Sequence, residues 1–173
     1  SQPSKVKKPS KIFVCSMGDL FGDWAPTSWI DSIMRRVEHA PQHTFQFLTK
    51  NPKRLKDFNP WPSNCWVGTT VTNQADDWRI GELLKVDARV QFVSHEPLLG
   101  AIDLSCPHCD GHGRTFGENY GVTTCNYCGG GDIGEDGISW AIIGALTGPG
   151  AVKPDPEWVQ GLIDQYQAAG VPC

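Results

Sequence analysis

Short apolar segments alternate along this chain with longer stretches whose apolar residues recur at helical spacing. This alternation is typical of βαβ units, in which a helix connects two parallel strands. Buried strands are expected at 11–16, 44–49, 65–71, 89–94 and 138–144. Helices are expected at 26–39, 52–58, 73–84 and 156–169. This alternation fits either an open doubly wound sheet or part of a β/α barrel. No G-x-G-x-x-G motif follows the first strand, which weakens the dinucleotide-binding version of the doubly wound sheet.

The second informative feature is a set of four cysteines in two C-x2-C pairs, Cys106 with Cys109 and Cys125 with Cys128. Two thiolates on one tight turn can reach the same metal ion, and two such turns complete a tetrahedral zinc site. The run from Cys106 to Gly113 resembles the zinc-binding repeat of the DnaJ-type cysteine-rich domain. We predict a structural Zn²⁺ site, with two disulfides or an iron–sulfur cluster as the alternatives.

The cysteine pairs lie in a polar, glycine-rich stretch, which predicts three parts for the chain. Residues 1–104 and 138–173 would form the β/α fold, and 105–137 would be an inserted zinc knuckle. The other cysteines, Cys15, Cys65 and Cys173, are expected to be small buried residues. Trp29, Trp78, Trp140 and Trp158 fall on apolar stripes and are predicted to belong to the core.

Composition restricts the class of protein. The chain has 173 residues, 39% hydrophobic content and a net charge of -4, which argues against broad phosphate binding, although residues 4–11 form a local basic stretch. No apolar run approaches the length of a membrane span, and unpaired cysteines suit a reducing compartment, so a cytoplasmic location in a bacterial or phage-infected cell is expected. The sequence ends as if a strand were cut short, and we expect a fragment.

Polar residues follow each expected strand, and the carboxyl ends of parallel strands are where chemistry is found in both architectures. The ligand-binding candidates at these ends are Ser16, Asp19, Lys50, Thr70, Asn73, His95 and Glu96. Most have a plainer alternative: Asp19 suits a turn, Lys50 a solvated surface, Asn73 a helix cap, and Glu96 a capping carboxylate for nearby loop amides. His95 could act as an acid or base near neutral pH, or simply fill space.

Several of these segments resemble a phage- and prophage-associated family of unknown function. The resemblance is carried by residues 13–21, 40–50, 95–100, 148–151 and 168–172, and it covers most of the chain outside the cysteine-rich insert. Full-length members of that family look like radical-SAM-type proteins with a partial β/α barrel. The resemblance therefore implies an α/β partial barrel, S-adenosylmethionine as cofactor and an iron–sulfur cluster held by an opening three-cysteine motif. Glu96 beside Pro97 would then bind the amine or ribose of the adenosyl ligand.

Three departures from the family pattern affect this expectation. The three-cysteine segment is not in this sequence, His95 stands where members often have cysteine, and residues 144–150 lack a glutamate that members carry. We therefore expect a fragment of an S-adenosylmethionine-dependent modifying enzyme, inactive alone, that acts on a nucleotide, nucleic acid or protein. Its catalytic residues are unknown. The alternative is a non-catalytic, zinc-stabilised module that binds nucleic acid or a protein partner.

Overall fold

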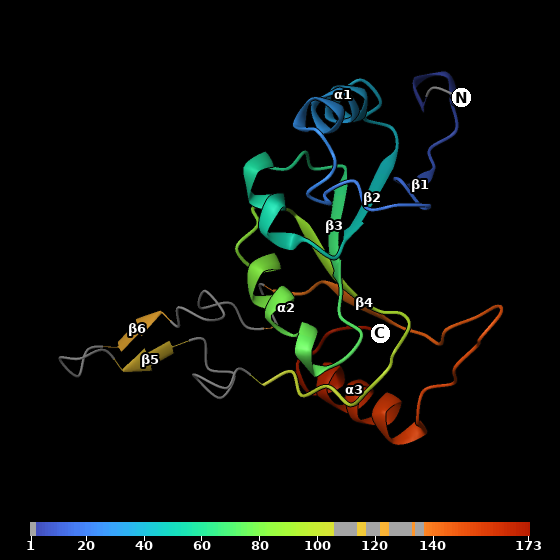
Figure 1. The fold of residues 1–173 in the computed structure, drawn as a ribbon. Helices are drawn as coiled ribbons and strands as arrows, with labels where there is room; N and C mark the ends of the chain where they lie inside the picture. Colours follow the sequence, from blue (N-terminus) through green and yellow to red (C-terminus); the bar gives the residue numbers. More distant parts are fainter. Residues whose placement is uncertain (1–2, 106–113, 117–121, 125–132, 134–136) are drawn as a thin grey trace.

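A computed structural model describes residues 3–105, 114–116, 122–124, 133 and 137–173 (Figure 1). Its main element is a five-stranded sheet of β1 (Lys11–Phe13), β2 (Thr44–Thr49), β3 (Cys65–Thr70), β4 (Val90–His95) and β7 (Trp140–Ile143). The α-helices are α1 (Thr27–Glu38), α2 (Trp78–Leu83) and α3 (Pro156–Ala168). Short 3-10 helices are η1 (Pro3–Lys5), η2 (Pro52–Phe58) and η3 (Gln74–Asp76). Within the described residues, no helix has the length and apolarity needed to cross a membrane.

The order of the strands decides between the two expected architectures. All five are parallel, and each lies beside the strand that precedes it in the main sheet, in the order β1-β2-β3-β4-β7. A doubly wound sheet reverses this order at a switch point, whereas right-handed crossovers without reversal put every helix on the same face. The sheet is therefore a curled half-barrel, and the prediction of an α/β partial barrel is confirmed at that level.

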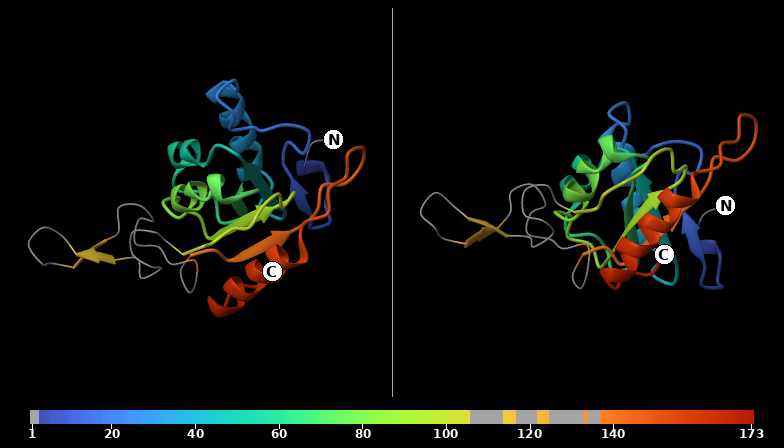
Figure 2. Two further views of the ribbon diagram at one scale, coloured as in Figure 1. Left: turned by 60° about the horizontal axis from the view of Figure 1, so that its bottom comes forward. Right: turned by 90° about the horizontal axis from the view of Figure 1, so that it is seen from below.

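One face of the sheet forms the hydrophobic core. Phe47, Val67 and Val93 project from it at alternate positions and pack with apolar residues of all three α-helices. The helical contribution to this single cluster is Ile30, Val37, Ile80, Leu83, Leu162 and Tyr166. Figure 2 shows α3 running beside β4 and β7, away from α1. Cys65 belongs to this face, where burial raises the pKa of its thiol to about 12 and keeps it protonated.

The opposite face carries a second, aromatic layer. The Phe92 and Trp140 rings stack at 4.8 Å between centroids, and Trp66 meets Trp140 edge-on at 5.8 Å. Phe92 lies across β3 because Gly68 leaves room for it, since a Cβ at Gly68 would stand 2.7 Å from the ring. Lys11 places its ammonium 4.8 Å from the Trp66 ring centroid. Trp140 thus packs on the face away from the helices rather than in the core between sheet and helices.

Several predictions about local structure were wrong. β1 ends at Phe13 instead of residue 16, because Cys15 adopts a φ of 59° and leaves the extended conformation. Cys15 and Cys173 are exposed instead of buried. Trp29 is also exposed, at 56%, although its helical spacing predicted a core position.

The cysteine-rich insert contains a short antiparallel pair, β5 (Arg114–Phe116) with β6 (Val122–Thr124), which the sequence did not predict. This pair forms a sheet of its own, apart from the half-barrel in Figure 1. β7 pairs with β4, so the half-barrel continues on both sides of the insert in sequence.

Candidate functional site

The carboxyl ends of β1, β2, β3, β4 and β7 share one edge of the half-barrel because the strands are parallel. This carboxyl edge carries most of the residues that the sequence predicted. Some of these side chains form hydrogen bonds within the protein. The others have polar groups that remain free to bind a ligand.

Glu96 is the clearest member of the second group. It follows β4 directly, is exposed, and its carboxylate has no hydrogen bond or ion pair to any described residue. The side chain lies against Gly144, which follows β7, and a Cβ at Gly144 would stand 3.0 Å from Cγ and Cδ of Glu96. The backbone there is fixed by Gly144 N–H donating to His95 and by Leu98 N–H donating to Gly144. Glycine at 144 therefore permits the observed position of the Glu96 carboxylate.

Thr70 and Ser94 lie beside each other in register at the ends of β3 and β4. They alternate with the helix-facing residues Thr69 and Val93, so they belong to the same face as the aromatic layer. Both are buried. They add two hydroxyl groups near the carboxyl edge, two residues beyond Gly68 and Phe92 on their strands.

Lys50 and Ser16 are exposed at the ends of β2 and β1. The Lys50 ammonium makes no ion pair within the described part of the chain. Ser16 lies in the turn after β1, between Cys15 and the fully exposed Met17. The side chains of these two residues make no hydrogen bond or ion pair with described residues, so they remain available to a ligand.

Asp19 forms hydrogen bonds that connect two of the strand ends. One carboxylate oxygen accepts from the Phe21 backbone N–H, and the other accepts from the Thr49 hydroxyl and the Lys50 N–H, at 2.8 to 3.0 Å. With these three hydrogen bonds Asp19 ties the loop after β1 to the end of β2. The turn-forming alternative that the sequence offered for Asp19 matches this geometry, and we leave Asp19 out of the candidate site.

Asn73 caps η3, because its side-chain oxygen accepts from the Ala75 N–H at 2.9 Å. A neighbouring network that sequence reasoning missed fixes the end of β3. Asp76 accepts from the backbone and hydroxyl of Thr72 and pairs with Arg79 at 2.8 Å, while Arg79 donates to the Thr70 carbonyl. The Asp76–Arg79 spacing of i,i+3 was a usable signal in the sequence.

His95 lies on the helix-facing side, fully buried, in contrast to Glu96. Its Nδ1 donates to the Val71 carbonyl at 2.8 Å, and its Nε2 accepts from the Tyr166 hydroxyl at 2.7 Å. Burial lowers the pKa of the imidazole to about 4, partly offset by the bond to Val71, so the ring is neutral near pH 7. The expectation that His95 acts as an acid, base or ligand contact is replaced by a structural role.

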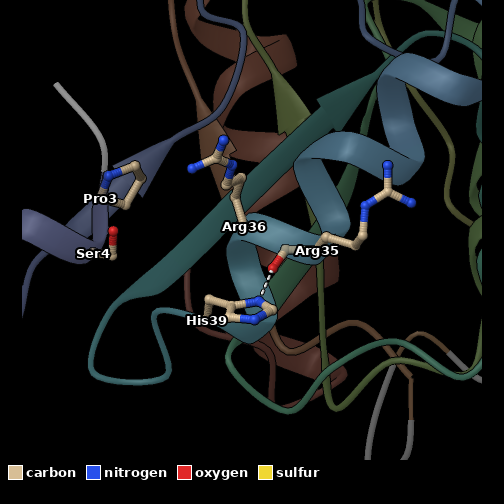
Figure 3. A pocket seen from close by; sticks show the side chains of 5 residues that line it. All are labelled: Pro3, Ser4, Arg35, Arg36 and His39. Carbon is tan, nitrogen blue, oxygen red and sulfur yellow. Dashed lines mark hydrogen bonds between the residues drawn. The ribbon is translucent and has the colours of Figure 1, made fainter.

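A pocket of about 410 Å³ lies at the other edge, where α1 ends, and is lined by Pro3, Ser4, Arg35, Arg36 and His39 (Figure 3). His39 is turned back onto the helix, where its Nδ1 bonds the Arg35 carbonyl at 2.6 Å. Arginine and histidine at a helix C-terminus complement the negative end of its dipole. This pocket contains none of the predicted ligand-binding residues, and its charges already have a structural explanation.

The predicted zinc ligands, Cys106, Cys109, Cys125 and Cys128, lie outside the described residues, so the zinc site stays a prediction. Among the residues that the structure describes, no three His, Cys, Asp or Glu side chains gather as a metal site would require. Cys15, Cys65 and Cys173 do not form a cluster of ligands.

A protein-family model matches residues 1–173, the whole chain. The chain belongs to the family described as "Protein of unknown function (DUF5131)". Searches among curated proteins and among solved structures gave no match. Membership in DUF5131 carries no assigned activity, so we infer function from the geometry of the carboxyl edge.

Proposed function

We propose that this chain is part of an S-adenosylmethionine-dependent modifying enzyme of the radical-SAM type, from a phage-associated family, and that its carboxyl edge binds the adenosyl ligand. The observation that carries the proposal is the free Glu96 carboxylate at the end of β4 in a sequential parallel half-barrel. In such folds ligands bind at this edge. A cytoplasmic location belongs to the same proposal.

The residues present fit an adenosyl ligand. The Glu96 carboxylate is an acceptor for an ammonium or a ribose hydroxyl, and Gly144 provides the space in which it lies. The Thr70 and Ser94 hydroxyls add neutral donors and acceptors on the adjacent strand ends. When bound, S-adenosylmethionine would supply the reactive group for modification of the substrate.

The described residues do not fit an iron–sulfur cluster. Such a cluster is held by several thiolates together, and Cys15, Cys65 and Cys173 do not gather. We derive no step through a cluster. The role that we assign to this chain is to bind and orient the adenosyl ligand.

Equilibrium dialysis with radiolabelled S-adenosylmethionine tests the proposal directly. We expect saturable binding by the parent chain and at least a tenfold loss in Glu96→Gln, since removing one partner of a charge-assisted hydrogen bond costs about 1.5–3 kcal/mol. Gly144→Ala should also weaken binding by displacing the Glu96 side chain. The matched control is Glu38→Gln at the end of α1, which should bind like the parent.

Failure of the parent chain to bind at millimolar ligand would refute the proposal for this chain. Equal affinity of Glu96→Gln and the parent would refute the role of Glu96. The first result would favour the alternative, a non-catalytic zinc-stabilised module that binds nucleic acid or a protein. Two exposed tryptophans, Trp24 and Trp29, support a binding surface of this kind.

A further inference from the structure

Two exposed tryptophans stand beside the carboxyl edge. Trp24, in the loop between β1 and α1, is 64% exposed, and Trp29, in the first turn of α1, is 56% exposed. Their rings meet edge-on, with centroids 6.3 Å apart. Exposed aromatic groups of this size are unfavourable in water and typically mark a binding surface.

The loop that presents Trp24 is held firmly. Arg54 of η2 donates to the carbonyls of Gly22 and Ala25, both at 2.7 Å, and to the Thr27 hydroxyl. Asn51 donates to the Phe21 carbonyl and to the Asp23 carboxylate. Side-chain hydrogen bonds from the segment after β2 therefore fix a loop whose tip exposes an indole ring.

Gly22 contributes to the same arrangement. A Cβ at Gly22 would stand 2.5 Å from Nε1 and 2.8 Å from Cδ1 of Trp24, so glycine is needed for the indole to lie against this loop. A ring that is pre-positioned in this way loses little conformational entropy when a ligand binds. The Trp24–Trp29 pair is thus a prepared contact surface.

Two lysines are sequence neighbours of the residues that hold the tryptophan loop. Lys50 and Lys53 adjoin Asn51 and Arg54, the residues that hold the tryptophan loop, and neither lysine joins an ion pair in the described part of the chain. Lys53 is held with its ammonium 5.0 Å from the centroid of the Trp78 ring. Exposed aromatic rings, together with cations that make no ion pair among the described residues, match a polyanion with exposed bases, because bases stack on the rings and phosphates bind the ammonium groups.

We infer that the Trp24–Trp29 pair, with Lys50 and Lys53, binds single-stranded nucleic acid and delivers it to the carboxyl edge. This names the substrate class of the site proposed above and rests on that proposal for the chemistry. Nucleic-acid binding itself requires no adenosyl ligand.

Fluorescence anisotropy with labelled oligothymidylate and oligouridylate, measured on the full chain without S-adenosylmethionine, provides the test. Comparing the two oligonucleotides distinguishes DNA from RNA as the source of the strand. We expect binding at low ionic strength, together with quenching of tryptophan fluorescence. Trp24→Ala and Trp29→Ala should each weaken binding about 5- to 150-fold. Both side chains are exposed, so unchanged thermal melting should show that the variants fold.

The lysines give a second readout. Lys50→Ala with Lys53→Ala should reduce the slope of log affinity against log salt by about 0.7 for each lysine. The matched control is Lys7→Ala with Lys8→Ala, which changes the net charge equally on the exposed segment before β1 and should leave the slope unchanged.

Three results would overturn the inference: no binding of either strand at low salt, tryptophan variants that bind like the parent, or equal binding of a duplex, whose bases cannot stack on protein. The first would assign the tryptophan pair to a protein partner instead. Dialysis with S-adenosylmethionine is a separate measurement, so the failure of one proposal is distinguishable from the failure of the other.

Discussion

The hydroxyl of Tyr166 in α3 donates a hydrogen bond to Nε2 of His95 at 2.7 Å, and both side chains are fully buried. Because Nδ1 of the same ring donates to the Val71 carbonyl, the neutral ring has its only acceptor at Nε2. Burial also raises the pKa of Tyr166 and keeps the hydroxyl protonated as a donor. The bond therefore connects the last helix to the end of β4, one residue before Glu96.

Replacing Tyr166 with Phe should destabilise the protein by about 1–3 kcal/mol, because Nε2 of His95 would stay buried without a donor. Urea unfolding at neutral pH measures this change. The cycle of Tyr166→Phe, His95→Phe and the double variant isolates the pairwise contribution. Additive effects in that cycle would contradict a direct interaction between the two side chains.

The buried neutral imidazole also predicts how stability depends on pH. The pKa of His95 falls from its ordinary 6.5 to about 4 on folding, so between these values the unfolded chain binds more protons than the folded chain. The stabilising effect of His95 is therefore fully present above pH 6.5 and is lost as pH falls towards 4. The expected loss is about 3 kcal/mol.

Urea unfolding at several pH values, for the parent chain and for His95→Gln, checks this dependence. The variant has no imidazole to protonate, so its stability should fall less over the same range. Carboxylates titrate in both proteins and cancel in the comparison. Parallel curves for the two proteins would show that His95 does not bind a proton in this window.

Gly68→Ala should disturb the aromatic layer, because the added Cβ would stand 2.7 Å from three atoms of the Phe92 ring. Displacing a buried ring of this kind costs about 1–3 kcal/mol. The control is Gly161→Ala in α3, where a Cβ meets nothing within 4 Å and helix propensity should stabilise by about 1 kcal/mol. Opposite shifts in melting temperature are expected for the two variants.

The predicted zinc site gives a separate test. Purified parent protein should contain about one zinc ion per chain, and Cys125→Ser should lose it. Zinc binding energy in small modules stabilises the local fold. The buried residues of the half-barrel core all lie outside the insert, and Ile133 of the insert packs against them. We therefore expect the variant to keep the near-ultraviolet circular dichroism of the buried aromatic residues.

Metal analysis decides among the alternatives for the four cysteines. Iron with absorbance near 400 nm would indicate an iron–sulfur cluster at these residues. A metal-free protein with four blocked thiols would indicate disulfides. Cys125→Ser protein that retains the zinc content of the parent would refute the assignment of Cys125 as a ligand.

The sequence alone determined most of the secondary structure. β2 was predicted at its observed bounds, because alternating polar and apolar residues over 44–49 fit a strand with one buried face. A helix cap was the alternative that the sequence offered for Asn73, and its side chain accepts from a backbone N–H two residues away. Such interactions are local, and the residues that make them are adjacent in the chain.

Only the tertiary structure decided which face or neighbour each side chain meets. Helical spacing predicts a core position for Trp29, yet its side chain in the first turn of α1 is 56% exposed. His95 and Glu96 are adjacent in sequence, but the alternation at the end of β4 buries the first against α3 and leaves the second exposed beside Gly144. These relationships join residues far apart in the chain, so they depend on how strands and helices pack and not on local pattern.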